Sequence, residues 1–203
     1  VSGMWNVGAE KFMQSIKSVL SDLKIRASYG VNGNQPGALY GYMGLYSYGQ
    51  NYMGASGSYE SSQPNTNLGW EKNYNLNIGL DLAFINRIFV SLEYYNRDTK
   101  DLLYKSDIPS SVGYISQMQN IGQVTNKGIE LSISGDILRG RDYVLSANLS
   151  LGMNKMKVDK LNGTDNVIWD QNNRWKSSYN DYCLKVGDQV GLIYGFVYDG
   201  LYS

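Results

Sequence analysis

Hydrophobic and polar residues alternate along several stretches of the chain, most clearly in NYNLNIGLDL at residues 73–82. Its even positions are Tyr74, Leu76, Ile78, Leu80 and Leu82, and its odd positions are Asn73, Asn75, Asn77, Gly79 and Asp81. Only an extended strand places such residues on opposite faces. The stretch therefore predicts a strand with one apolar face and one polar face.

The same alternation recurs at residues 23–31, 88–97, 129–137 and 143–154, with Phe89 as an exception. Residues 1–7 and 192–198 are less clearly patterned candidates for two more strands. One segment has another period, because Phe12, Ile16, Val19 and Leu20 fall at i, i+4, i+7 and i+8. This spacing predicts a short amphipathic helix over residues 10–21 in an otherwise all-β chain.

The connections between these stretches differ in length. Residues 84–87 and 138–142 are predicted as tight turns, whereas 32–69, 98–123 and 157–189 are long, polar connections. In an antiparallel up-and-down sheet every second connection lies at the same end. One end should therefore carry the tight turns and the helix, and the other the long loops, which is typical of outer-membrane barrels.

The length of the strands and their aromatic ends indicate what the apolar face contacts. Strands of a soluble sandwich typically run five to six residues, but these patterns continue for about ten, the length that crosses a bilayer at a tilt. Trp70, Tyr74 and Phe84 lie near strand ends, as in interfacial aromatic girdles. We therefore favour a transmembrane β-barrel over a soluble sandwich with a dry core.

A barrel assigns each alternating residue a direction. We expect an outward, lipid-facing set of Leu76, Ile78, Leu80, Leu131, Ile133 and Leu149. We expect an inward set of Asn75, Asn77, Glu93, Glu130 and Asn148, facing a hydrated lumen. Six or seven strands are too few to close, because such barrels begin at eight. The chain is thus expected to be part of a larger barrel.

Composition excludes several classes of function. The formal net charge is zero, so nothing indicates binding to nucleic acid. The chain has no His and a single Cys, Cys183, so it lacks the usual zinc ligands and any Ser–His or Cys–His pair. It also lacks a phosphate-binding loop, and Asp98 and Asp101 are read as a turn cluster rather than paired catalytic carboxylates. We expect no enzyme activity, no cofactor and no metal.

Two of the long connections contain candidate ligand-binding aromatic residues. Residues 37–54 are rich in Tyr and Gly, include Tyr46 and Tyr48, and are expected to form in part a β-ribbon. Residues 162–175 combine Asn and Asp side chains with Trp169 and Trp175. Such rings stack on sugars or other ligands, although packing between the loops explains them as well.

Five blocks of the sequence resemble a known family. They are LKIRASYGVNGNQ at 23–35, NLGWEKNYNLNIGLD at 67–81, YYNRDTKDLLY at 94–104, NIGQVTNKGIELSI at 120–133 and VGDQVGLIYGFVYDGLY at 186–202. They resemble the SusC/RagA family of TonB-linked outer-membrane transporters of the Bacteroidota. The resemblance implies the later part of a 22-stranded barrel. Residues 1–203 would then be a partial barrel domain, without the plug domain, the TonB box and the terminal strands.

The resemblance also implies a function, partners and a location. The whole protein would lie in the outer membrane of a Gram-negative bacterium, in contact with its lipid. It would import oligosaccharides or peptides together with a SusD-like surface lipoprotein, and TonB would supply the energy through the plug. The alternatives are a passive porin or surface adhesin, and a soluble carbohydrate-binding sandwich.

Overall fold

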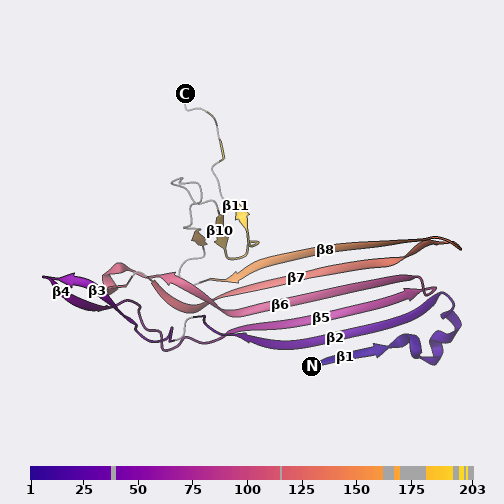
Figure 1. Cartoon of the computed structure of the whole chain (residues 1–203), viewed down its shortest axis with the longest axis horizontal. Helices are drawn as coiled ribbons and strands as arrows, with labels where there is room; N and C mark the ends of the chain where they lie inside the picture. Colours follow the sequence, from indigo (N-terminus) through magenta and orange to yellow (C-terminus); the bar gives the residue numbers. More distant parts are fainter. Residues whose placement is uncertain are drawn as a thin grey trace. The chain divides into compact units, whose positions relative to one another are not determined.

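The computed structural model describes residues 1–37, 40–114, 116–161, 167–169, 182–193, 197–198 and 200, and all their side chains except those of residues 50, 107, 167–169 and 182. Six strands form the main sheet, in the order β1-β2-β5-β6-β7-β8, and Figure 1 shows them side by side. They are β1 (Ser2–Asn6), β2 (Leu20–Asn34), β5 (Glu71–Phe84), β6 (Ile88–Asp107), β7 (Ser116–Arg139) and β8 (Val144–Lys160). All five strongly patterned stretches lie within or almost wholly within these strands, which confirms the all-β prediction.

Two smaller sheets complete the described strands. The antiparallel ribbon β3 (Tyr46–Tyr52) and β4 (Ala55–Glu60) confirms the ribbon expected within residues 37–54. The other sheet has the order β11-β10-β9, with β9 (Val167–Trp169), β10 (Tyr182–Lys185) and β11 (Leu192–Ile193). β11 covers the first two residues of the strand expected over residues 192–198, whereas Val197 and Tyr198 are not in a strand and residues 194–196 lie outside the described part.

The helix predicted over residues 10–21 is wrong in type and in length. The segment contains two short 3-10 helices, η1 (Val7–Ala9) and η2 (Lys11–Ile16), and Leu20 already begins β2. The turn after β5 holds the end of the segment extended, because the Ile85 amide donates to the Val19 carbonyl at 2.9 Å and the Asn86 amide to Ser21 Oγ at 2.9 Å. Phe12 remains exposed, so a longer helix would gain no stability from packing this side chain.

The strands also continue beyond their alternating pattern. β6 reaches Asp107 and β7 begins at Ser116, so most of the loop predicted over residues 98–123 is strand, and the remaining connection holds the 3-10 helix η3 (Ser110–Val112). Asp98 and Asp101 accordingly lie inside β6 and not in a turn. Main-chain pairing requires no alternation of side chains, which is why the pattern ended before the strand did.

The chain divides into two compact units. The first comprises Val1–Asn32, Asn73–Asp98 and Thr125–Met156, and the second Gly33–Lys72, Thr99–Val124 and Lys157–Ser203. Both tight turns and the 3-10 helices η1 and η2 belong to the first unit, and nearly all of the three long connections belongs to the second. The grouping of connections that the sequence predicted is therefore confirmed.

Very few side chains of the described residues are buried. The buried hydrophobic ones are Val7, Met13, Ala83, Val158 and Leu161. The apolar side of the six-stranded sheet is open, with Ile78 44% and Leu149 52% exposed. The described part of the chain thus provides no second layer for a sandwich core. None of its helices is long and apolar enough to cross a membrane.

Candidate functional site

A network of charged and hydroxyl side chains joins three neighbouring strands on the polar face of the first unit. Arg26 of β2 forms a bidentate ion pair with Asp81 of β5, with Nε 2.7 Å from Oδ2 and Nη2 3.2 Å from Oδ1. Ser91 of β6 donates to Asp81 Oδ1 at 2.8 Å, and Glu93 Oε2 lies 3.7 Å from Arg26 Nη2. A single guanidinium is thus shared by two carboxylates, and the arrangement leaves a hydrogen-bonding surface.

Asparagine side chains extend this network along the strands. Asn77 Nδ2 donates to Ser28 Oγ at 3.4 Å, and Arg97 Nε donates to Asn75 Oδ1 at 2.8 Å. Asn75, Asn77 and Glu93 therefore share one face, as the alternation predicted. Further along the sheet, Ser146 Oγ of β8 donates to Asp136 Oδ1 of β7 at 2.8 Å, and both occupy the same alternating set as the predicted inward residues Glu130 and Asn148.

A glycine makes room for the central arginine. A Cβ at Gly79 would lie 2.9 Å from Arg26 Nη2 and 3.0 Å from its Cζ, so a larger residue would displace the guanidinium. Sequence patterning placed Gly79 on the polar face but gave no sign of this contact, since it depends on the register of β2 against β5.

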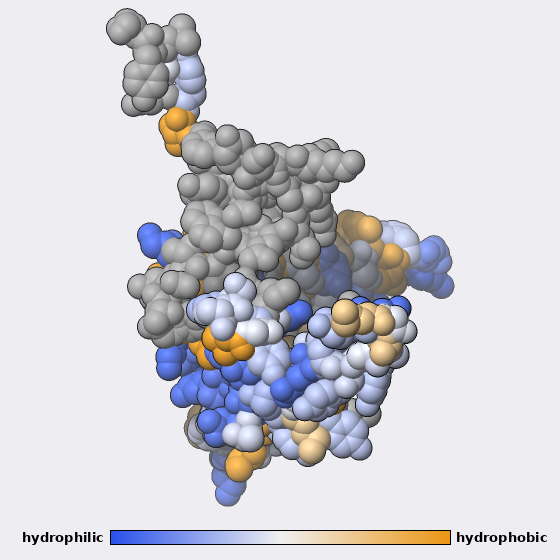
Figure 2. All heavy atoms as spheres, turned by 90° about the vertical axis from the view of Figure 1, so that its left-hand side faces the viewer, coloured by the Kyte–Doolittle hydropathy of each residue, from blue (hydrophilic) through white to orange (hydrophobic). Residues whose placement is uncertain are grey.

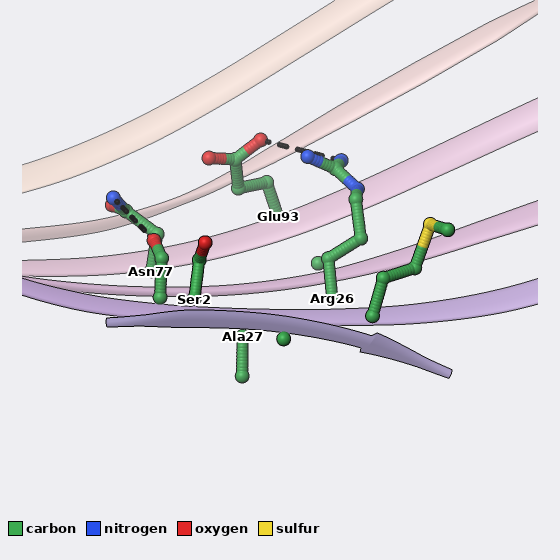
Figure 3. A pocket seen from close by; sticks show the side chains of 9 residues that line it. Ser2, Arg26, Ala27, Asn77 and Glu93 are labelled. Atoms are coloured by element: carbon green, nitrogen blue, oxygen red, sulfur yellow. Dashed lines mark hydrogen bonds and ion pairs between the residues drawn. The ribbon is translucent and has the colours of Figure 1, made fainter.

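The network borders a shallow hollow of about 430 Å³. Side chains that line it include Ser2, Arg26, Asn77 and Glu93, which point to one side of the sheet in Figure 3, while Ala27 points to the other. The hollow offers a guanidinium, a carboxylate, an amide and hydroxyl groups, so it suits hydrated polar groups. Its lining contains neither a Cys nor a His, which leaves it without the usual nucleophile and base pair.

The ribbon carries the predicted residues Tyr46 and Tyr48 in the second unit. Both are well exposed, at 62% and 79%. Tyr46 pairs with Glu60 and Tyr48 with Ser58, and a bulge at Gly49, whose φ is 107°, shifts the register by one residue. An extra residue on one strand reverses the alternation beyond it. Tyr52 is therefore on the opposite face from Tyr46 and Tyr48, together with Tyr59.

The other two predicted site residues are not placed with these tyrosines. Trp169 belongs to β9, but its side chain is outside the described part, and Trp175 lies wholly outside the described residues. The assignment of Tyr46, Tyr48, Trp169 and Trp175 to ligand binding stays a prediction.

Figure 2 looks at the side on which Figure 1 draws β3 and β4, and its coloured surface is mostly hydrophilic with scattered hydrophobic residues.

Glu60 and Tyr114 form a contact at the base of the ribbon that the sequence did not reveal. The Tyr114 hydroxyl donates to Glu60 Oε2, and this hydrogen bond raises the pKa of Tyr114 to about 12. The Glu60 carboxylate also lies over Gly44, where an added Cβ would overlap it. The two partners are 54 positions apart, so no local pattern could have paired them.

Hydrogen bonds between the connection from β4 to β5 and the start of β7 help to hold the second unit together. Asn65 Nδ2 donates to the Met118 carbonyl at 2.8 Å, and Gln117 Nε2 donates to the Pro64 carbonyl at 2.7 Å. Within the described residues no group of three or more His, Cys, Asp or Glu side chains could hold a metal ion. The two hydrogen bonds fix residues 64 and 65 against β7.

Comparisons with known proteins give one consistent family. A family model described as TonB dependent receptor-like, beta-barrel matches residues 4–199. TonB-dependent receptor P3 of Formosa agariphila is 33% identical over 203 residues, covering 98% of this chain and 20% of that protein. TonB-dependent receptor SusC of Bacteroides thetaiotaomicron is 34% identical over 196 residues, covering 92% of this chain and 18% of that protein.

Solved structures agree with these relatives. A chain of the RagAB peptide transporter superposes with a TM-score of 0.79 at 28% identity, covering 92% of this chain and 20% of the other. The RagAB peptide importer in its open-open state gives the same values. The chain spans about a fifth of the length of the relatives that it matches.

Proposed function

The chain belongs to the TonB-dependent receptor β-barrel family, and on that premise we propose that it forms part of the wall of an outer-membrane importer. The whole protein would take up oligosaccharides or peptides in a process powered through TonB. A SusD-like surface lipoprotein would act as its partner. Similarity to a peptide transporter supports peptide cargo, and similarity to TonB-dependent receptors supports this mode of energisation. Oligosaccharide cargo follows from the family resemblance of the sequence blocks.

The observation that carries the proposal is the contrast between the two faces of the sheet. The polar face is satisfied by hydrogen bonds that run from strand to strand, as in the Arg26–Asp81–Ser91 network. The opposite face exposes Ile78, Leu149 and Leu151, and nothing in the described part of the chain covers them. Hydrocarbon on one side and a hydrated lumen on the other account for both faces.

The tyrosine ribbon gives the importer a place for first contact with cargo. The tight turns of the sheet fit the periplasmic side, because periplasmic turns are short and extracellular loops long in such barrels. By the same rule the long connections, among them the one that carries the ribbon, would face the extracellular side. Exposed aromatic rings at Tyr46 and Tyr48 suit stacking on sugars or on apolar side chains of peptides.

Uptake of labelled cargo by cells that produce the complete protein tests the proposal. We expect uptake to stop in cells without TonB and after addition of an uncoupler, and to fall sharply when the lipoprotein partner is deleted. A passive porin would continue to admit cargo under the first two conditions. Uptake that survives the uncoupler would therefore contradict energised import.

A second experiment tests the ligand-binding residues. Simultaneous replacement of Tyr46, Tyr48, Trp169 and Trp175 by Ala removes four rings from two of the long connections, which we predict to lie outside the lipid-facing strands. We expect weaker capture of cargo or of the partner, with normal barrel assembly. Unchanged uptake and unchanged partner binding would exclude these loops from recognition.

A further inference from the structure

The side-chain amide of Asn120, in β7, bonds to the backbone of two other segments of the second unit. Its Oδ1 accepts a hydrogen bond from the Gly69 amide at 2.7 Å, and its Nδ2 donates to the Gly69 carbonyl at 3.0 Å. The same Nδ2 donates to the Asp101 carbonyl at 2.9 Å. The side-chain amide of Asn120 thus both accepts from and donates to the backbone of Gly69, as a peptide group would. Its bond to the Asp101 carbonyl connects Asn120 and Gly69 to β6.

Gly69 occupies the end of the connection that carries the ribbon. It lies two residues before β5, and the connection from β2 begins after Asn34. The next residue, Trp70, packs over Gly33, where an added Cβ would lie 2.7 Å from the Trp70 ring. The outgoing and returning ends of the ribbon connection are therefore close together, beside the Asn120 amide.

Asp101 is strained at the point where Asn120 binds it. Its φ of 56° is in the left-handed region, which a residue other than glycine adopts inside a strand only when its surroundings hold it there. Asn120 holds its carbonyl, and Lys72 Nζ lies 3.0 Å from its carboxylate. The first contact connects β6 to β7, and the second connects β6 to Lys72 at the start of β5, three residues after Gly69.

From this geometry we propose that Asn120 is a positioning residue for the tyrosine ribbon. Its amide fixes the return of the ribbon connection against the strained Asp101, so that Tyr46 and Tyr48 are presented to cargo in one orientation. We call the three hydrogen bonds of the Asn120 side-chain amide the clamp. The presentation of the tyrosines to cargo rests on the proposed function, whereas the clamp itself does not. The partners are backbone groups, so the role depends on an amide at position 120 that both donates and accepts.

Asn120→Asp is the sharpest probe of this role. It keeps the size of the side chain and the Oδ1 acceptor, but it replaces the donor by an anionic oxygen facing two carbonyl oxygens. Asn67→Asp is the matched control, because it makes the same change of charge at an exposed side chain two residues before Gly69. Both variants are made in the complete protein, and their barrels are checked by mobility on unheated gels.

Limited proteolysis in detergent with a protease of broad specificity measures the clamp. We expect Asn120→Asp to be cut within residues 35–70 at least roughly five times faster than wild type, because cleavage follows the open population and both hydrogen bonds donated by Nδ2 are lost. Asn67→Asp should be cut at the wild-type rate. Equal rates for Asn120→Asp and wild type, or for the two variants, would overturn the clamp.

Measurements of cargo uptake test whether the clamp also affects the binding of cargo. We expect Asn120→Asp to raise the half-saturating cargo concentration and to leave the maximal rate unchanged. Faster cleavage with unchanged half-saturation would overturn the positioning role. Wild-type cells that take up no cargo would contradict the proposed function instead, and the cleavage rates would still decide whether the clamp exists.

Discussion

Neighbouring residues of β5 have opposite surroundings, and charge is the best probe of the difference. Ile78 is on the exposed apolar face, whereas Asn77 bonds to Ser28 on the polar face. In the complete protein, we expect Ile78→Arg to lower the free energy of unfolding in lipid vesicles by roughly 2–4 kcal/mol, and Asn77→Arg to lower it much less. Similar losses in both variants, measured by denaturant titration, would contradict the assignment of the faces.

Tyr114 provides a prediction for pH dependence. Its pKa of about 12 lies above the usual value because the hydroxyl donates to Glu60, so the neutral phenol is stabilised. The contribution of this contact to stability should be complete below pH about 10, the ordinary pKa, and should be lost as the pH rises through about 12.

The ionisation of Tyr114 can be followed by the ultraviolet absorbance of tyrosinate. The difference between the titration curves of wild type and Tyr114→Phe should contain one group that ionises near pH 12. Glu60→Gln removes the carboxylate and should move that group to lower pH. A difference curve that does not change in the Glu60→Gln background would show that another group causes the shift.

At the scale of the element, the turn between β5 and β6 is strained in a way that a substitution can relieve. Ile85 and Asn86 both have φ of 51°, and the Arg87 amide donates to the Phe84 carbonyl at 2.9 Å. A β-branched residue is unfavourable in this left-handed region, whereas Asn is common there. Since Ile85 is 60% exposed, its replacement sacrifices little packing.

We therefore expect Ile85→Asn to raise the free energy of unfolding by about 1 kcal/mol. Ile85→Val keeps the β-branch and serves as the control, with no gain expected. Denaturant titration of the complete protein in vesicles measures both. A gain in the Val variant equal to that in the Asn variant would show that backbone strain is not the cause.

The elements also show how far the sequence predicts this structure. β5 was predicted well, because Leu76 and Asn77 must face different surroundings and the alternation records that requirement. The end of β6 was not, because main-chain pairing extends it to Asp107 without any alternation. The segment at Phe12 has a helical period, yet hydrogen bonds donated by the amides of Ile85 and Asn86 in the distant turn keep its last residues extended.

The candidate site was predictable only in part. Tyr46 and Tyr48 could be found because a run of Tyr and Gly is unusual, and the expected ribbon is present. Their separation from Tyr52 could not, because it follows from one bulge at Gly49. Asn120, Glu60 and Tyr114 were missed because their partners are distant in the sequence and are in part backbone groups.

At the scale of the whole molecule, the open apolar face requires a cover. Ile25, Leu145 and Leu151 are all exposed on the sheet, and few side chains of the described residues are buried. We expect the complete protein to sediment with membranes and to become monodisperse only after extraction with detergent. Size-exclusion chromatography with light scattering measures this, and a monodisperse monomer without detergent would instead favour the soluble alternative.

The order of strands in the sheet has a consequence for how the chain folds. Each strand of the six is added beside the one before it, except that the ribbon intervenes between β2 and β5. Three residues, 85–87, separate β5 from β6, but 36 residues, 35–70, separate β2 from β5. Closing the longer loop costs about 2 kcal/mol more in chain entropy. Prior formation of the ribbon shortens the effective loop, so pulse-labelling hydrogen exchange should detect protection in β3 and β4 before the pairing of β2 with β5.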